Sequence, residues 1–258
     1  MNQSFQAQTD SQWQVIQQIL NDKRQRYHSL RTVIDAILWL NYTGLQWREL
    51  DKMTGTKLPW QTVYYHFRQF KLRGVWEQIL DSLVVSERKR HQRADTPSLL
   101  AIDSQSVKIM QFIKEETGLD ANKKINGRKR SITVDRLGLP WSVAVTAANV
   151  SDNEAGGLVI DRLRGKVPRL EVIAADHGYK VSFIEHVANQ HGWRVEIAQK
   201  PESGRGFVPE KNRWPVERSF GWLNFRRRLF RDVDKTVESS EAMLRIGFIS
   251  ILLNRLTK

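Results

Sequence analysis

The first 95 residues carry apolar side chains at the spacing of amphipathic helices. Between residues 10 and 27, Trp13, Ile16, Ile19 and Leu20 recur every three or four positions, which is the spacing of a buried helix face. A glycine follows several of the later periodic stretches and is typical of a helix end. The pattern predicts helices over residues 10–27, 29–41, 47–53, 60–73 and 75–85. We therefore expect an all-helical N-terminal region.

Two of these predicted helices have the pattern that is typical of a helix-turn-helix motif. The short helix 47–53 is followed by Thr54 and Gly55 and then by the aromatic, basic helix 60–73. In that case the second helix would present a DNA-recognition surface. Its members would be Tyr64, Tyr65, His66, Arg68, Gln69, Lys71 and Arg73. The alternative is that its phenylalanines and some of its tyrosines are core, and that its bases only solvate one face.

The polar stretch 86–97 is the candidate linker, and the hydrophobic period changes after it. Apolar and alternating runs then predict strands, separated by helical patterns. We expect strands over residues 99–109, 130–135, 139–147, 170–175 and 194–199, and helices over 153–164, 181–191, around Glu217 and near the C-terminus. This order predicts a mixed α/β sheet with flanking helices, a ribonuclease-H-like layout. The predicted domains are residues 1–95, helical, and residues 96–258, ribonuclease-H-like.

The charge of the chain favours a polyanionic partner. Its 258 residues have a formal net charge of +13, and the basic residues come in clusters, one of them over residues 123–136. Nucleic acid is the first candidate and an anionic membrane surface the second. There is no cysteine, which excludes disulfides and thiolate metal sites. The longest apolar run is short for a membrane span and the N-terminus has no signal-peptide layout, so we expect a soluble, cytoplasmic, nucleoid-associated protein.

Two aspartates stand where an α/β sheet usually binds its ligand. Asp103 lies on the first predicted strand, and Asp176 follows the fourth. If those strands are neighbours, both carboxylates lie side by side above the sheet end. The alternative is local: Asp103 could bond its own backbone in an Asx turn, and Asp176 could be an ordinary turn residue before His177 and Gly178.

Glu217 is an isolated acid in a basic stretch. From Arg205 to Arg231 there are eight Lys or Arg residues and two carboxylates. Pro215 favours a helix start just before Glu217, and Gly221 would follow on the same helix face. This arrangement suggests a metal ligand next to a polyanion. The alternative is a first-turn glutamate that is stabilised only by the helix macrodipole.

Three carboxylates on separate elements suit phosphodiester chemistry. Two divalent cations can neutralise the phosphate, activate a hydroxyl and stabilise the leaving oxygen. Mg²⁺ prefers oxygen ligands and retains waters, so Asp103, Asp176 and Glu217 would suffice. We expect two Mg²⁺ (or Mn²⁺) ions, provided that the fold brings the three residues together. His177 is expected to be a hydrogen-bonding or DNA-facing residue.

An ordered set of motifs resembles a known family. The stretches are residues 102–108 (IDSQSVK), 126–135 (NGRKRSITVD), 145–152 (VTAANVSD), 175–179 (ADHGY) and 213–224 (RWPVERSFGWLN). They resemble bacterial insertion-sequence DDE transposases, nearest the insertion-sequence-five family, and residues 45–67 resemble that family's helical N-terminal domain. The resemblance implies a ribonuclease-H-like catalytic domain that cuts DNA at inverted repeats and joins it to a target. It also implies a metal-bound triad of Asp103, Asp176 and Glu217, with Arg213 as an accessory base.

The leading hypothesis is therefore a transposase acting on double-stranded DNA, as a homodimer or higher oligomer that pairs two element ends. The expected DNA-binding residues are Arg213, Arg218, Arg226, Arg227, Arg228, Lys123, Lys124, Arg128, Lys129, Arg130, Tyr65, Arg68 and Lys71. One alternative is a helix-turn-helix regulator, derived from a transposase, that binds DNA without cutting it. Another is a plain nuclease of the same fold, which would hydrolyse without joining.

Overall fold

The computed structural model describes residues 7–22, 24–52, 58–198 and 213–257. The helices are α1 (Asp10–Leu20), α2 (Leu30–Thr43), the short 3₁₀ helix η1 (Trp47–Lys52), α3 (Trp60–Leu72), α4 (Val75–Arg90), α5 (Asp152–Asp161), α6 (Val181–His191), α7 (Trp214–Leu223), α8 (Arg227–Phe230) and α9 (Val237–Leu256). The strands are β1 (Leu99–Lys108), β2 (Gly118–Asp120), β3 (Ile125–Val134), β4 (Pro140–Ala147), β5 (Val172–Ala175) and β6 (Arg194–Ile197).

The strands form one mixed sheet. Its order is β2-β3-β1-β5-β6, and β4 also pairs with β3. The strands β1, β3 and β4 are antiparallel neighbours, whereas β1, β5 and β6 run parallel. The parallel register aligns Leu99 with Val172 and Ala101 with Ala174. The first and fourth strands predicted from the sequence are thus adjacent and parallel, and β5 ends beside the middle of the longer β1.

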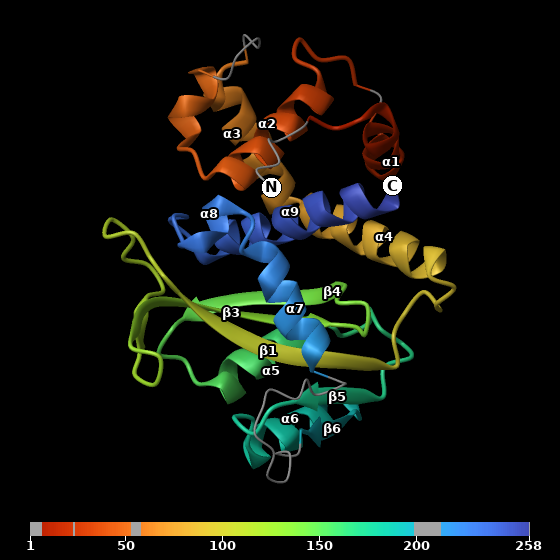
Figure 1. Cartoon of the computed structure of the whole chain (residues 1–258), viewed down its shortest axis with the longest axis vertical. Helices are drawn as coiled ribbons and strands as arrows, with labels where there is room; N and C mark the ends of the chain where they lie inside the picture. Colours follow the sequence, from red (N-terminus) through yellow and green to blue (C-terminus); the bar gives the residue numbers. More distant parts are fainter. Residues whose placement is uncertain (1–6, 23, 53–57, 199–212, 258) are drawn as a thin grey trace, which may run out of the picture.

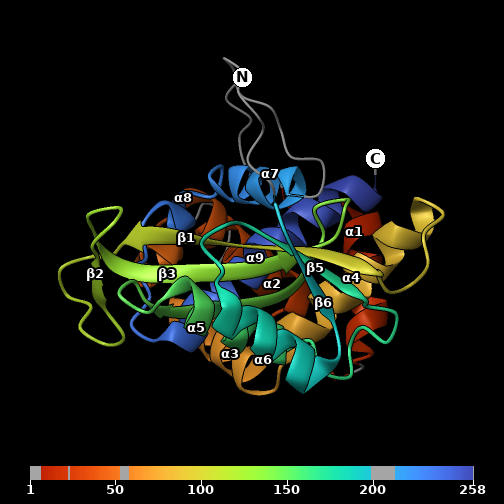
Figure 2. The ribbon, with the colours of Figure 1, turned by 90° about the horizontal axis from the view of Figure 1, so that it is seen from below.

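Helices cover both faces of this sheet. In Figure 2, α7 lies on one side of β1 and β3, and α5 and α6 lie on the other. Figure 1 shows α9 and α4 between the sheet and the N-terminal helices. Because both faces are covered, β3 and β4 are buried along almost their whole length. The predicted ribonuclease-H-like α/β fold with a helical N-terminal region is confirmed.

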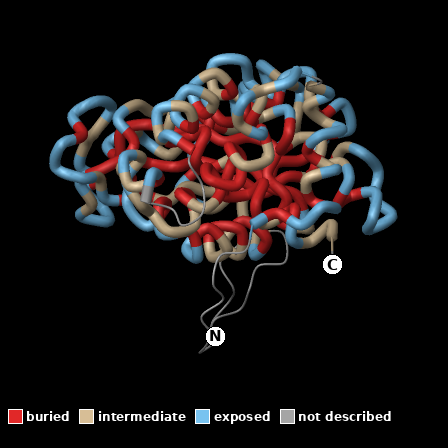
Figure 3. The backbone as a smooth tube through the Cα atoms, turned by 90° about the horizontal axis from the view of Figure 1, so that it is seen from above, coloured by how far each residue is buried: buried red, intermediate tan, exposed pale blue. Residues whose placement is uncertain are grey.

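The helical region and the sheet share one hydrophobic core. The core cluster runs from Ile16 and Ile34 in the N-terminal helices to Ile102 and Ile132 in the sheet. The helix α9 packs against α4, α2 and β4, and twelve of its residues are buried. Figure 3 shows that the buried backbone continues through the centre of the molecule. The division of the chain at residue 95 stays a prediction.

Several predicted boundaries differ from the observed ones. The predicted linker 86–97 begins as helix, because α4 continues to Arg90. The reason is packing: Glu87 is buried beside Arg90, and the buried guanidinium of Arg88 donates to the carboxylate of Asp135. The first strand of the predicted hairpin, 130–135, in fact begins at Ile125. The turn Thr54–Gly55, the segment 201–209 and Glu210 lie outside the described residues.

None of the helices in the described part of the chain is both long and apolar enough to cross a membrane.

Candidate active site

Asp103 lies in the middle of β1, on the strand that crosses the centre of the sheet. Its Oδ1 accepts a hydrogen bond of 2.7 Å from the backbone N–H of Ser104. Burial raises the pKa of the Asp103 carboxyl to about 6, although the Ser104 hydrogen bond and the positive charge of Arg213 act in the opposite direction. The Asx-type contact considered from the sequence is therefore present. The same carboxyl also feels the charges of Arg213 and Asp176.

Asp176 comes directly after β5, on the neighbouring parallel strand. It stands two residues beyond Ala174, and Asp103 stands two residues beyond Ala101, the register partner of Ala174. The Oδ1 of Asp176 accepts a 2.9 Å hydrogen bond from the backbone N–H of Gly178, which fixes the turn into α6. The register thus places the two aspartates beside each other at the point where β5 ends next to β1.

Glu217 reaches the same place from above the sheet. It lies in the first turn of α7, a helix that contacts β1 and β3. Pro215 occupies the second position of this helix, where its missing N–H leaves no hydrogen bond unmade. A Cβ built at Gly221 would meet open space, so this glycine is not in close contact with another element.

Arg213 joins the three carboxylates. Its Nη2 lies 3.8 Å from Asp103 Oδ2, 3.8 Å from Asp176 Oδ2 and 3.7 Å from Glu217 Oε1. The guanidinium is mostly buried, at 17% side-chain exposure, whereas Glu217 is 38% exposed. Three acids separated by 73 and 41 positions in the chain therefore meet around one cation at a solvent-accessible edge.

Ser104, next to Asp103 on β1, connects the site to Asp152 at the start of α5. The Ser104 hydroxyl donates to Asp152 Oδ1 at 2.8 Å, and the Lys129 ammonium contacts the same oxygen at 2.8 Å. Burial opposes ionisation of Asp152, but its contacts with Lys129 and Ser104 lower its pKa overall. The hydroxyl of Tyr179 is buried near these acids, and burial and their charges raise its pKa. Among the described residues it has no hydrogen-bond partner.

Five of the thirteen expected DNA-binding side chains are buried. Arg128 donates to the backbone carbonyls of Glu115, Asp234 and Lys235, at 2.7 to 3.0 Å. The others also contact the protein interior: Lys129 the carbonyl of Val150, Arg130 that of Leu229, Arg226 the ring of Tyr42, and Arg228 the carboxylate of Asp234. These five side chains are thus engaged inside the protein, and their expected contact with phosphates stays a prediction. A basic stretch in the sequence does not reveal which of its cations the sheet and helices cover.

The remaining expected DNA-binding residues are accessible to different degrees. Lys123, Lys124, Arg227 and Arg68 are exposed, and Tyr65 has 58% of its surface accessible. Three more are half-buried: Arg213, Arg218 over the ring of Trp222 at 5.0 Å, and Lys71, whose Nζ contacts Ser239 Oγ at 3.0 Å. In α3 the buried side chains are Val63, Phe67 and Phe70. The helix therefore uses one face for the core and leaves Tyr65 and Arg68 on the surface. His177 is also exposed, next to Asp176.

A basic groove adds residues that the sequence did not single out. It has a volume of about 650 Å³ and is lined by Lys108 at the end of β1, Lys114, Lys124 and Arg231, with no carboxylate in its described lining. The pairing of β1 with β3 brings Lys108 near the segment of Lys124, and a bridge between Ile109 and Asp232 brings in Arg231. The only sequence signal is the excess of basic residues itself.

Two comparisons with known proteins agree on one family. Residues 94–253 match a family profile described as "Transposase DDE domain". Residues 9–80 match another, described as "Putative transposase of IS4/5 family". A Burkholderia cepacia protein described as "Putative transposase for insertion sequence element IS402" is 32% identical over 140 residues, which cover 51% of this chain and 65% of that relative. The chain therefore matches somewhat less than two thirds of the relative's length.

Proposed function

The chain belongs to the DDE transposases of insertion sequences, and from this premise we propose that it cuts DNA at the ends of an element and joins them to target DNA. The observation that carries the proposal is the meeting of Asp103, Asp176 and Glu217 around the Arg213 guanidinium. We propose these three acids as the catalytic and metal-binding residues.

Transposase DDE domains use divalent metal ions. The donor set here fits such an ion, because three carboxylates offer only oxygen ligands and already surround a positive group. We propose that they hold two Mg²⁺ (or Mn²⁺) ions. When bound, the ions would neutralise phosphate charge and lower the pKa of an attacking water or hydroxyl.

The protein's own residues would position the DNA strand. Arg213 offsets the charge of the three acids in the free protein, and we propose that its guanidinium donates to a phosphate oxygen when DNA binds. Lys129 and Ser104 both contact Asp152 at the start of α5. We propose that these contacts hold β1, and with it Asp103, in place. We propose that water first hydrolyses the phosphodiester at the element end. The liberated 3′-hydroxyl then attacks a target phosphodiester, whose own 3′-oxygen leaves.

The exposed cations outline the proposed DNA path. Lys123, Lys124, Arg218 and Arg227 remain available from the expected set, and the groove of Lys108, Lys114, Lys124 and Arg231 extends it. Such cations bind a phosphate backbone regardless of sequence. Tyr65 and Arg68 on α3 are the proposed base-reading surface.

The proposed working form is a homodimer or higher oligomer on double-stranded DNA, because two ends of one element must be brought together. The substrates are the terminal inverted repeats and the target DNA. No membrane partner is proposed.

The test is an assay of Mg²⁺-dependent cleavage and strand transfer on a plasmid that carries the terminal repeats of the element. We expect Asp103→Asn and Glu217→Gln each to lower both rates by at least about 100-fold, because metal-ion catalysis supplies several kcal/mol and each ~1.4 kcal/mol is a factor of ten. Asp95→Asn is the matched control: this exposed acid pairs with Lys89, away from the triad, and should keep wild-type rates.

A gel that separates nicked from joined products distinguishes the alternatives. Nicking without joining in the wild-type protein would indicate a plain nuclease. DNA binding without any Mg²⁺-dependent product would indicate a regulator. Wild-type rates in either triad variant would remove that residue from the proposed site.

A further inference from the structure

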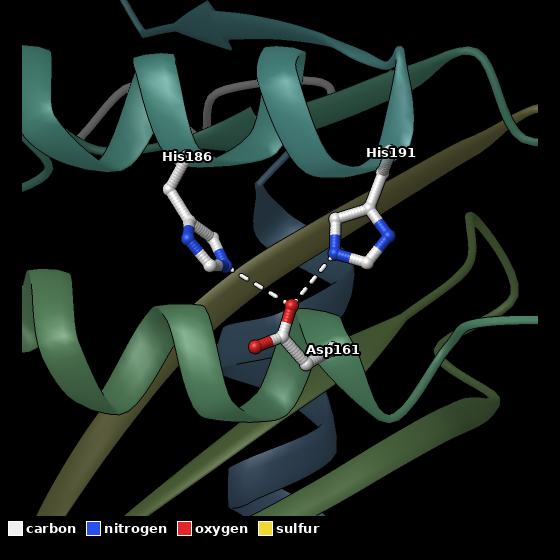
Figure 4. Close-up of side chains that lie close together, drawn as sticks. All are labelled: Asp161, His186 and His191. Carbon is white, nitrogen blue, oxygen red and sulfur yellow. Dashed lines mark hydrogen bonds and ion pairs between the residues drawn. The ribbon is translucent and has the colours of Figure 1, made fainter.

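Two histidines and an aspartate meet between α5 and α6, apart from the carboxylate triad. Figure 4 shows the side chains of His186 and His191, from α6, pointing at Asp161, the last residue of α5. The Nε2 atoms lie 3.0 Å and 2.7 Å from the same Asp161 oxygen, Oδ1. The three ligand atoms all lie within 4.8 Å of one another. Nothing in the proposed reaction uses this cluster.

The cluster is partly built in advance. The side chain of His191 is 2% exposed, and its ring stacks on Trp193 with centroids 4.6 Å apart and planes 14° apart. Gly192, in the left-handed conformation at φ 71°, makes the turn that brings Trp193 back onto the histidine. His186 and Asp161 are 35% and 43% exposed. One ligand is therefore fixed by packing, and the other two leave an opening to solvent.

The C-terminal ends of α5 and α6 add a negative electrostatic potential that favours a cation. At the other end of the pair, the Lys180 N–H donates to Asn153 Oδ1 at 2.7 Å, so the N-termini of α5 and α6 lie together. The two helices therefore run parallel, and Asp161 and His191 are their C-terminal residues. The partial negative charges of both helix dipoles are concentrated at this end.

We propose that Asp161, His186 and His191 form a binding site for a zinc-class divalent ion. Two imidazoles and one carboxylate are a common zinc donor set, with water in a fourth position, whereas Mg²⁺ prefers oxygen ligands alone. Tetrahedral coordination at ~2.0–2.1 Å separates ligand atoms by about 3.3 Å. The two nitrogens would therefore move away from Oδ1, from 3.0 Å and 2.7 Å, and would come to about the same spacing from each other, from at most 4.8 Å.

The bound ion would link the C-terminal ends of α5 and α6. Gly156 of α5 lies directly under the rings of Tyr179 and Phe183, so the helices are already in close contact. Asp176 is in the loop that leads into α6, and Asp152 begins α5. A metal ion bound at the C-terminal ends would stabilise the pair of helices. The N-terminal ends of the same helices lie next to the triad. This inference does not depend on the proposed reaction.

The site is tested by titrating chelator-treated protein with Zn²⁺ in excess Mg²⁺, at a pH above the histidine range so that the imidazoles are neutral. The readouts are the rise in Tm and, with Co²⁺ as the probe, the visible spectrum of a tetrahedral ion. We expect His186→Gln and Asp161→Asn to weaken Zn²⁺ binding by at least about tenfold, because each removes a direct ligand and even the loss of a group that hydrogen-bonds a ligand costs about tenfold or more. Glutamine can keep a hydrogen bond to Asp161, so folding should persist.

Two controls separate this cluster from other sites. His177→Gln removes an exposed histidine outside the cluster, and Asp103→Asn alters the triad. Both should bind Zn²⁺ like the wild type. Equal affinity in His186→Gln and wild type, or Zn²⁺ binding that Asp103→Asn abolishes, would overturn the proposal. So would the absence of Zn²⁺ binding in the wild type, which would leave the three residues as a hydrogen-bonded cluster only.

Discussion

The guanidinium of Arg213 lies between three carboxylates that come from three different elements. Like charges so close together would repel one another, and a buried cation offsets that repulsion. Arg213 therefore lets the acids converge in the free protein, before any metal ion binds. The pKa of Asp103 is nevertheless raised, because the effect of burial exceeds that of the Ser104 hydrogen bond and the charge of Arg213.

Arg128 and Lys124 offer a direct comparison of a buried and an exposed cation. Arg128 is 0% exposed and lies 3.4 Å from the equally buried Asp232. Replacing Arg128 with Met should lower the free energy of unfolding by about 3–5 kcal/mol, because it removes the nearest cation from a buried carboxylate and leaves buried carbonyls without their donor. Lys124→Gln should change this free energy by less than about 0.5 kcal/mol, because the side chain is exposed. Urea unfolding measures both.

The same pair separates stability from DNA contact. Lys124→Gln should reduce the slope of log K against log salt by about 0.9, the value for one lost phosphate contact on duplex DNA. Folded Arg128→Met protein should keep the wild-type slope. A smaller slope in Arg128→Met than in Lys124→Gln would contradict the assignment of Arg128 to the interior.

For single residues, the sequence indicated which side chains are candidates for function, but not which of them are buried. Asp103, Asp176 and Glu217 stood out because acids are unusual after a buried strand or within a basic helix. Arg130 did not stand out from Lys124, because both lie in one basic stretch. Only the pairing of β3 between β1 and β4 decides which of them is covered.

The helices α5 and α6 approach each other closely at a glycine, and two neighbouring glycines test this contact. A Cβ at Gly156 would lie 2.7 Å from the Tyr179 ring and 2.9 Å from the Phe183 ring. Gly156→Ala should therefore destabilise the protein by about 1–3 kcal/mol through overpacking. At Gly157 the nearest atoms, those of His186, are 3.6 Å away, which is an ordinary contact.

Gly157→Ala is thus the matched control in the same helix. It should be neutral or stabilising by up to about 1 kcal/mol, because alanine favours helix over glycine. Urea unfolding of the two variants measures the difference. Equal stability would show that the helices can separate at Gly156, and the close contact would then not constrain the loop after Asp176.

Element boundaries were less predictable than the elements themselves. The helical and alternating periods gave α2, α3, α6, β1 and β4 close to their observed bounds. The end of α4 was missed because residues 86–90 are polar, and polar residues usually indicate a loop. Glu87 and Arg88 are nevertheless buried in ion pairs, a tertiary contact that overrides local preference. The start of β3 was missed for a similar reason.

For the whole molecule, the continuous core predicts one unfolding transition. The last helix, α9, contacts α1, α2, α3 and α4 as well as β4. The N-terminal helices and the sheet should therefore unfold together in calorimetry, with equal calorimetric and van't Hoff enthalpies. Two resolved transitions would mean that the parts on either side of residue 95 are energetically separate.

A core variant in α9 checks the same point. Leu253 is 2% exposed, and Leu253→Ala should cost about 2–5 kcal/mol by opening a cavity. In a single transition, signals from the helices and from the sheet shift to lower temperature together. A shift confined to one of these signals would argue for separate units.

The position of α9 also bears on synthesis. Residues 237–256 leave the ribosome well over a hundred residues after α1, α2 and α4, yet they pack against all three. At roughly 5–20 residues per second, the N-terminal helices emerge about ten to several tens of seconds before α9 can cover that apolar surface. A stop codon or frameshift upstream of Val237 would therefore leave a polypeptide exposed to proteases and chaperones, rather than a trimmed DNA-binding fragment able to compete with the intact protein.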